Sequence, residues 1–395
     1  MRKIIAVVTP FILVVTAWTL AIKSESMGVA AQSLFSVLPY VFAVLAIILS
    51  TWYQNSNSFF FTCLLLISYI YMTVLSKTPA MLFETISILS VLLPINAVWL
   101  SFSQERGIIS TYGRNKAIII GAQVLWALIS IMTKSSIKIP AEFSLPIINL
   151  KAPAIVLYIV CIFVLLMNYI FKGQYLSLIF VAVLIETFIM LHFAHRHLIV
   201  AIFMSSIFVI MVLALIEIFY SLAFYDPLTG VFSRRALEQE FLKLRGSYII
   251  AMVDLDHFKK INDTYGHDVG DQVLKMVASV LRQYAGTSRV FRYGGEEFVA
   301  IFTEMSYNQA VFKMDNVRKL IANRKFVIRD KNRPEVKPDN VTTSHNAFQN
   351  TINITVSIGL SQKNNLLKTP YEVLKKADEA LYKSKNSGRN CITKI

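Results

Sequence analysis

Residues 292–298 of this chain read Arg-Tyr-Gly-Gly-Glu-Glu-Phe, and the apolar run Val299–Phe302 follows directly. Two adjacent glycines predict a tight hairpin turn, because residues without a Cβ adopt turn conformations readily and let a ligand approach the backbone. Such a turn presents the carboxylates of Glu296 and Glu297 beside a strand. Taken alone, the acidic pair is equally well explained as a solvated turn, so its meaning depends on the surrounding sequence.

The sequence around this turn alternates short apolar runs with amphipathic stretches from Asp226 to the C-terminus. This alternation predicts an α/β or α+β domain. We expect strands over 248–253, 299–302 and 352–358, and helices over 271–281 and 371–385. The stretch 329–349 is rich in Pro, Asn and Asp, and we expect an extended hairpin or a mobile loop there.

The N-terminal half has a different composition. The whole chain is 55% hydrophobic and only 16% charged, and its mean hydropathy is +0.56. Residues 1–220 contain 12 of the 39 basic and 6 of the 24 acidic residues, and the first aspartate is Asp226. Because a charged side chain at the bilayer centre costs several kcal/mol, we expect residues 1–220 to form a membrane domain. Residues 221–395 form a separate second domain.

Eight apolar segments are long enough to cross a bilayer, which takes roughly 20 residues. They are 4–22, 34–53, 58–76, 80–102, 117–133, 153–171, 175–193 and 197–220. The first follows Arg2 and Lys3 as a signal peptide would, but no convincing small-residue cleavage site ends it, so we expect a retained anchor.

The loop charges predict the orientation of these segments, because Lys and Arg favour the cytoplasmic side. Basic residues on one predicted side are Arg2, Lys3, Arg106, Arg114, Lys116 and Lys172, and those on the other side are Lys134, Lys138, Lys151 and Arg196. The first group supports a cytoplasmic N-terminus. An even number of spans then places the C-terminal domain in the cytoplasm as well, attached to a bacterial inner membrane.

Other features of the composition are less specific. Cys63, Cys161 and Cys391 imply no disulfide framework. The net charge of +15 is spread over loops and a soluble domain without a basic stripe, so we expect anionic lipid and a phosphorylated substrate as partners, and no nucleic acid. Ionisable residues in or near the spans are sensor candidates, although interhelical hydrogen bonds and an exposed loop explain them more simply. They are Glu84, Glu186, Glu217, His192, His195, Arg196 and His197.

Four ordered blocks of the C-terminal half resemble the GGDEF domain, the diguanylate cyclase family, over the whole of 226–395. They are 225–235 (YDPLTGVFSRR), 254–271 (DLDHFKKINDTYGHDVGD), 292–298 (RYGGEEF) and 377–390 (ADEALYKSKNSGRN). One such block would be only suggestive, but four blocks in order at the family's spacing are highly specific. The resemblance implies a central, mostly antiparallel sheet flanked by helices.

The resemblance also implies a metal site. Asp254 ends a buried apolar strand, and hard carboxylate oxygens of this kind suit Mg²⁺ on a triphosphate. The family pattern assigns Asp254, the Leu255 carbonyl, Glu296 and Glu297 to the metals. We expect two Mg²⁺ ions per GTP, with Mn²⁺ as an alternative, and Asp254, Glu296 and Glu297 as catalytic residues. Glu296 is the best candidate for activating the attacking 3′-hydroxyl.

The family pattern assigns ten residues to GTP. A carboxylate accepts from both N1–H and the exocyclic amine of guanine, whereas an amide serves the O6 and N7 side. Residues expected near the base are Asn262, His267 and Asp271. Residues expected near the phosphates, or where the backbone comes close to the nucleotide, are His257, Phe258, Lys259, Gly294, Gly295, Lys385 and Arg389. Several have simpler structural explanations: Asp271 suits a helix N-terminus, Asp256 suits a helix N-cap, and Lys385 and Arg389 suit a helix C-terminus.

Two positions depart from the family pattern. Ser233 replaces the Asn usual in the opening block, which puts the local turn geometry in doubt. The family's inhibitory product site, an Arg-x-x-Asp motif, would fall on Ala285 and Ser288, so we expect no such site in its usual form.

The resemblance implies a membrane-bound homodimer that condenses two GTP molecules into cyclic di-GMP and is regulated by its membrane domain. The downstream receptors of the product cannot be identified from this chain. One rival is a non-catalytic GTP-binding or docking module, against which the intact acidic residues argue. Another is a transporter with a regulatory nucleotide domain, against which the lack of a clear broken-helix repeat argues.

Overall fold

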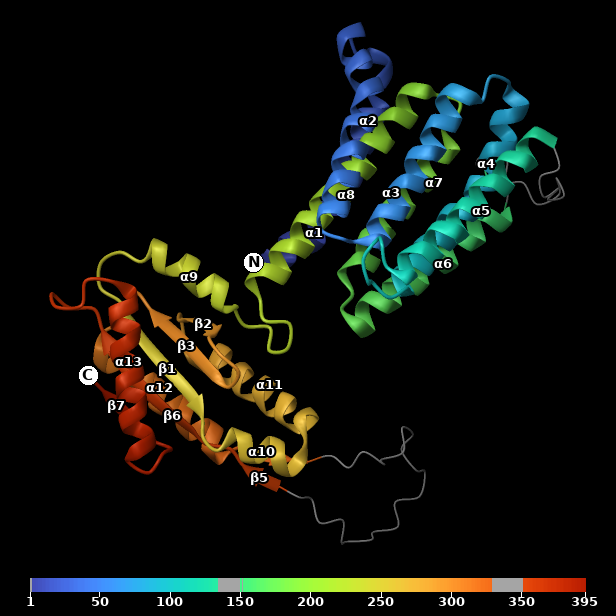
Figure 1. The fold of residues 1–395 in the computed structure, drawn as a ribbon. Coiled ribbons are helices and arrows are strands. Elements are labelled where there is room, and N and C mark those ends of the chain that lie inside the picture. The colour runs from blue at the N-terminus through green and yellow to red at the C-terminus, as the bar shows by residue number, and fades with distance from the viewer. Residues whose placement is uncertain (1, 134–149, 151, 329–350) are drawn as a thin grey trace. The chain divides into compact units, whose positions relative to one another are not determined.

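The computed structural model describes residues 2–133, 150, 152–328 and 351–395. The chain divides into two compact units, Met1–Phe219 and Tyr220–Ile395, which Figure 1 shows in blue to green and in yellow to red respectively. The predicted loop or hairpin 329–349 and the basic residues Lys134, Lys138 and Lys151 lie outside the described residues.

The N-terminal unit is a bundle of helices, as predicted. The helices are α1 (Arg2–Ile22), α2 (Val29–Trp52), α3 (Ser56–Ile70), α4 (Pro79–Phe102), α5 (Thr111–Thr133), α6 (Ala152–Lys172), α7 (Tyr175–His192) and α8 (His197–Phe224). A 3₁₀ turn, η1 (Ser24–Ser26), follows α1, and a π-helical segment, η2 (Tyr71–Leu75), extends α3. Within the described residues, eight helical segments are long and apolar enough to cross a membrane.

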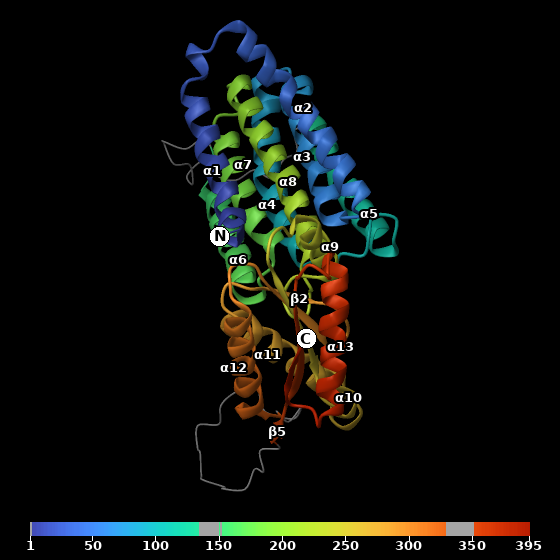
Figure 2. The same cartoon turned by 90° about the vertical axis from the view of Figure 1, so that its left-hand side faces the viewer.

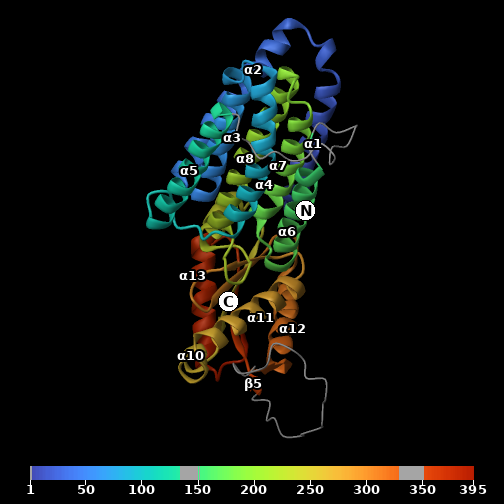
Figure 3. The same cartoon turned by 90° about the vertical axis from the view of Figure 1, so that its right-hand side faces the viewer.

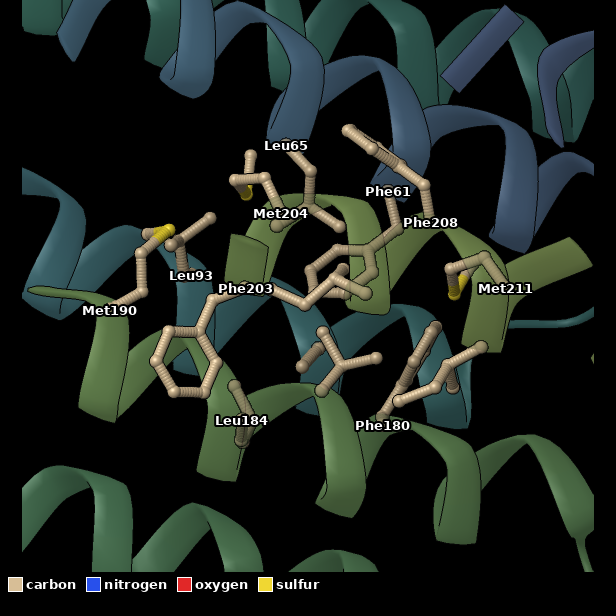
Figure 4. Packing of buried hydrophobic residues seen from close by; sticks show 14 of the residues in the cluster. Phe61, Leu65, Leu93, Phe180, Leu184, Met190, Phe203, Met204, Phe208 and Met211 are labelled. Carbon is tan, nitrogen blue, oxygen red and sulfur yellow. The ribbon is translucent and has the colours of Figure 1, made fainter. Parts of the chain in front are cut away.

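The helices of the bundle are buried to very different degrees. Buried residues make up 72% of the apolar segment of α7 and 78% of that of α8, against 17% in α1 and 22% in α2. Figures 2 and 3 show α7 and α8 passing through the middle of the bundle. In Figure 4, Phe203 and Phe208 of α8 lie among Phe61 of α3 and Phe180 of α7. The two central helices therefore form most of the core, and the outer helices present apolar side chains outward, as lipid contact requires.

Two polar networks are buried between these helices. The Glu105 carboxylate accepts from the backbone N–H groups of Ser56 and Asn57 at 2.9 Å each, which caps α3. Lys116, 3% exposed, donates to the Ser56 hydroxyl at 2.8 Å and to the Gln104 carbonyl at 3.0 Å. The placing of Arg114 and Lys116 in a loop was therefore wrong, because α5 begins at Thr111 and includes both residues.

The second network joins α6 to α7, and apart from it one of the sensor candidates makes a hydrogen bond between α7 and α8. Asn168 of α6 donates to the Ser177 hydroxyl of α7 at 2.8 Å. Glu186, fully buried in α7, accepts from the Ser206 hydroxyl of α8 at 2.7 Å. The hydrogen bond at Glu186 is of the interhelical kind that the simpler explanation requires.

The C-terminal unit is a five-stranded sheet in the order β2-β3-β1-β6-β7, in which only the β6–β7 pair is parallel. Its helices are α9 (Arg234–Lys243), α10 (Phe258–Tyr265), α11 (His267–Tyr284), α12 (Tyr307–Asn323) and α13 (Pro370–Asn386). Its strands are β1 (Ile249–Leu255), β2 (Arg289–Arg292), β3 (Glu297–Phe302), β6 (Val356–Gln362) and β7 (Ile392–Lys394), and β4 (Lys325–Val327) pairs separately with β5 (Thr351–Asn353). The predicted mostly antiparallel sheet flanked by helices is confirmed.

Alternate residues of β1 pack on opposite faces of the sheet, so this unit has two hydrophobic cores. Ile249, Ala251 and Val253 pack with α11 and α12, whereas Ile250 and Met252 pack with α9 and α13. Successive strand residues face opposite sides, so Asp254 falls on the α9 and α13 side. The strand predicted over 352–358 is wrong as one element, because β5 ends at Asn353 and β6 begins at Val356 in a different sheet.

Candidate functional site

Three carboxylates gather where β1 ends beside β3. Asp254 lies directly opposite Glu297 in the antiparallel register, and the Leu255 N–H donates to the Glu296 carbonyl at 3.4 Å. Residues directly opposite in an antiparallel pair share a face of the sheet. The Asp254 side chain is only 5% exposed, and its carboxylate accepts from the Lys385 ammonium of α13 at 2.9 Å.

The electrostatics show that these groups act on one another. Burial raises the pKa of Asp254, and the contact with Lys385 opposes that rise. Burial likewise raises the pKa values of Glu296 and Glu297, and the negative charge of Asp254 raises them further. Ionising all three carboxylates is therefore costly unless a further cation is present.

This donor set suits a hard divalent cation. Among the described residues, no cluster of three or more His, Cys, Asp or Glu side chains is arranged as a ready metal site. The chemistry nevertheless fits Mg²⁺, since it prefers oxygen ligands and is held by one or two carboxylates together with substrate phosphates. Asp254, Glu296, Glu297 and the carbonyl of Leu255, the last residue of β1, remain the residues proposed to hold it.

The signature turn is held by hydrogen bonds at its base. The N–H of Tyr293 donates to the Glu297 carbonyl at 2.8 Å, and the N–H of Gly294 donates to the same oxygen at 3.3 Å. A Cβ on Gly294 would collide with the Glu297 carboxylate, whereas a Cβ on Gly295 would meet open space. A side chain at Gly294 would therefore displace the Glu297 carboxylate, whereas Gly295 leaves an exposed backbone surface.

An ion pair joins this turn to the opening block. Arg292 donates to the two Asp226 oxygens at 3.0 and 3.1 Å and to the Gly295 carbonyl at 2.7 Å. Although burial opposes ionisation, hydrogen bonds from Thr229 and Arg292 lower the pKa of Asp226. The sequence alone assigned no role to Asp226 or Arg292, although both lie within the motif blocks. Their opposite charges were the available signal, and the contact itself depends on the fold.

The residues predicted to bind guanine lie on adjoining helices. Asn262 lies on α10, whereas His267 and Asp271 are exposed on α11 beyond the bend at Gly266. The Asn262 Oδ1 atom is buried and has no hydrogen-bond partner among the described residues. A buried acceptor without a partner is costly, so contacts within the described residues do not account for the orientation of this amide.

The predicted phosphate-binding residues come from two helix ends. His257 has a left-handed backbone (φ 57°) and precedes α10, on which Phe258 is buried and Lys259 is exposed. Lys385 lies in the last turn of α13, and Arg389 follows that helix with φ 64°. Of these residues, the structure brings Lys385 into direct contact with the predicted metal site.

The structure shows what the side chains of Asp256 and Ser233 do. Asp256 is not a helix N-cap: α10 is preceded by His257, whose side chain makes no capping bond, and the Asp256 carboxylate accepts from Thr355 and Ser357 instead. Ser233 does cap α9 by accepting from the Ala236 N–H at 3.4 Å. The altered residue in the opening block therefore still supports a helix start.

The residues at the position of the product site offer no charged contacts. Ala285 is 1% exposed and ends α11, while Ser288 is half-buried with a buried hydroxyl. Lys313 of α12 lies over the neighbouring Gly286. The absence of an inhibitory product site remains a prediction.

Fold and site together define an α/β domain with an acidic hairpin at the end of its central strand. Residues 223–391 match the family described as "Diguanylate cyclase, GGDEF domain". Curated relatives include diguanylate cyclase A of Treponema denticola, 35% identical over 36% of this chain and 34% of the relative. Another is the response regulator PleD of Caulobacter vibrioides, 35% identical over 43% of this chain and 36% of the relative.

Among solved structures, the GGDEF domain of DgcB from Caulobacter crescentus, in complex with c-di-GMP, is 31% identical. That comparison covers 44% of this chain and 95% of the other, with a TM-score of 0.38. The C-terminal unit therefore carries a GGDEF domain similar to those of diguanylate cyclases. It spans 34% to 39% of the length of the two named relatives and of a probable diguanylate cyclase, DgcT, of Escherichia coli.

Proposed function

We propose that this protein is a membrane-bound diguanylate cyclase that condenses two GTP molecules into cyclic di-GMP and two pyrophosphates. The observation that carries the proposal is the meeting of Asp254, Glu296 and Glu297 at one end of the sheet, with Lys385 beside them. The Asn262 amide on α10 adds a group for the O6 and N7 side of the base. The names of the relatives support the same activity.

In this reaction the 3′-oxygen of one GTP forms a bond to the α-phosphorus of the other, and the bond from that phosphorus to the bridging oxygen of pyrophosphate breaks. Bound Mg²⁺ would neutralise phosphate charge. Asp254, Glu296 and Glu297 would hold the ion. Glu296 would accept the proton of the 3′-hydroxyl.

Lys385 and Arg389 would bind the β- and γ-phosphates, with Lys259 and the backbone N–H groups of His257 and Phe258 on the opposite side. Asp271 would accept from guanine N1–H and the exocyclic amine, with His267 beside it. Adenine presents an acceptor at N1, so GTP should be strongly preferred.

Each domain would present one GTP, and a homodimer is needed because the ring closes by two reciprocal attacks. The apolar helices would place the protein in the bacterial inner membrane with residues 221–395 in the cytoplasm, where GTP is found. An uncharacterized membrane protein of Staphylococcus aureus is 31% identical over 42% of this chain. The membrane unit would regulate how often two catalytic domains meet.

The test uses full-length protein in lipid nanodiscs, supplied with GTP and Mg²⁺, with product identified by mass spectrometry. Glu296→Gln, Glu297→Gln and Asp254→Asn should each abolish turnover, because each removes a charged oxygen ligand while keeping the side-chain shape. Asp263→Asn, at an exposed position of α10, is the matched control. Wild-type rates in all three site variants would refute the assignment.

The Lys385–Asp254 contact favours one alternative, a domain that binds GTP without turnover, because an ammonium group lies where a metal is proposed. Equilibrium binding separates the two. GTP binding without any product at saturating Mg²⁺ would establish the alternative, whereas cyclic di-GMP formation would exclude it.

A further inference from the structure

The turn that carries Arg389 has an unusual backbone. Gly388, Arg389 and Asn390 have φ values of 103°, 64° and 44°, so three consecutive residues are left-handed. Only the glycine adopts that conformation without cost. Conformations of this kind persist only where surrounding contacts hold them, and they concentrate at functional sites.

The helix end explains the first part of this turn. The Arg389 N–H donates to the Ser384 carbonyl at 3.1 Å, and Gly388 occupies the left-handed position that commonly terminates an α-helix. This hydrogen bond does not explain why Asn390 continues in the left-handed region.

Two side chains from distant elements hold Asn390. The Asp256 carboxylate accepts from the Asn390 N–H at 3.0 Å. Arg318 of α12 donates to the Asn390 carbonyl and to its Oδ1, both at 2.9 Å. Every polar group of Asn390 except its side-chain NH₂ is therefore engaged by a charged group.

Both charged groups are themselves fixed. Asp256 is 5% exposed, and its other hydrogen bonds come from the Thr355 hydroxyl at 2.7 Å and the Ser357 hydroxyl at 2.6 Å. Arg318 is 16% exposed at its side chain and pairs with Asp315 at 2.8 Å. The strain of the turn is thus opposed by charge-assisted hydrogen bonds, which are stronger than neutral ones.

We propose that Asp256 and Arg318 are positioning residues that hold the Arg389 turn in its left-handed form and so orient its guanidinium toward the β- and γ-phosphates of GTP. This inference rests on the proposed function. Neither residue touches the nucleotide, and both act through the backbone of Asn390.

The test measures binding of a non-hydrolysable GTP analogue and of GMP to full-length Arg318→Met in nanodiscs. Loss of the clamp should weaken binding of the analogue about tenfold, the scale of one charge-assisted contact. GMP lacks the β- and γ-phosphates, so its affinity should stay at the wild-type value. Arg324→Met, at an exposed position that follows the same helix, is the control and should leave both affinities unchanged.

A double-mutant cycle separates positioning from a general loss of structure. In an Arg389→Ala background, Arg318→Met should have no further effect on analogue binding, because the guanidinium that it orients is gone. Additive effects, or equal losses for the analogue and GMP, would overturn the inference. Asp256→Asn should reproduce the result, because an amide offers one acceptor oxygen to three donors.

The experiment distinguishes an error in this inference from an error in the proposed function. If wild-type protein binds the GTP analogue and makes cyclic di-GMP but Arg318→Met binds the analogue normally, only the positioning role is wrong. If wild-type protein binds neither GMP nor the analogue, the proposed function is wrong.

Discussion

Gly270 provides a test of the guanine pocket that leaves every proposed ligand residue in place. It is buried in α11, and a Cβ at this position would collide with the Asn262 Oδ1 atom and stand 3.2 Å from Cζ of Phe258. Phe258 is fixed in the core, whereas Asn262 has a flexible side chain. In Gly270→Ala we therefore expect the Asn262 amide to swing out of the pocket.

The magnitude follows from the hydrogen bonds to guanine that this movement removes. One or two hydrogen bonds to the base are worth about 1–2 kcal/mol together, which corresponds to a rise of roughly 5- to 30-fold in KM for GTP. Alanine is favoured over glycine in a helix by about 1 kcal/mol. This gain offsets part of the cost of the local crowding, so we expect the domain to stay folded. Because base binding is equal in ground and transition states, kcat should stay near the wild-type value.

The assay is steady-state cyclic di-GMP formation across GTP concentrations, with thermal unfolding followed by circular dichroism. Ser279→Ala, at an exposed position of the same helix, isolates the effect of helix propensity. An unchanged KM in Gly270→Ala, with folding intact, would show that Asn262 does not contact the base.

Three further predictions address pH, feedback and topology. Because burial raises the pKa of Asp254 and Lys385 opposes the rise, activity should be lost as pH falls through this raised pKa and the carboxylate protonates. In Lys385→Met the acidic limb of the pH–rate profile should move to higher pH; a limb that stays in place would contradict the coupling. Since Ala285 and Ser288 offer no charged contact, cyclic di-GMP added at low micromolar levels should leave the initial rate unchanged, and potent noncompetitive inhibition would reveal another product site. Reporter fusions at Ile395 should report a cytoplasmic C-terminus, and an external signal would refute the eight-span topology.

Local patterns were sufficient to predict the elements that carry the site. The apolar run before Asp254 predicted β1, and the two glycines before Glu296 predicted the hairpin, because both depend on residues adjacent in sequence. The helix predicted over 371–385 is observed as Pro370–Asn386 for the same reason. Hydrophobic periodicity and turn residues act over a few residues, so the local sequence predicts these elements directly.

Contacts between distant segments could not be predicted in this way. The sequence suggested that Asp256 caps a helix, but the register of β1 against β6 and the packing of α13 bring it Thr355, Ser357 and Asn390 as donors. No local window contains the information that selects such partners. Lys116 was misplaced for a different reason, because α5 begins at Thr111, ahead of the apolar run expected over 117–133.

The uneven burial of the bundle has a consequence for how freely its sequence can vary. A helix whose residues are mostly buried, as 78% of those in the apolar segment of α8 are, has few positions where a change of side-chain volume is harmless. On α1 and α2, one apolar residue can replace another wherever the side chain is exposed on the outside of the bundle. A saturation library scored for membrane expression should therefore show a nearly uniform band of intolerance along α7 and α8. Along α1 and α2, intolerant and permissive positions should instead alternate with the helical repeat.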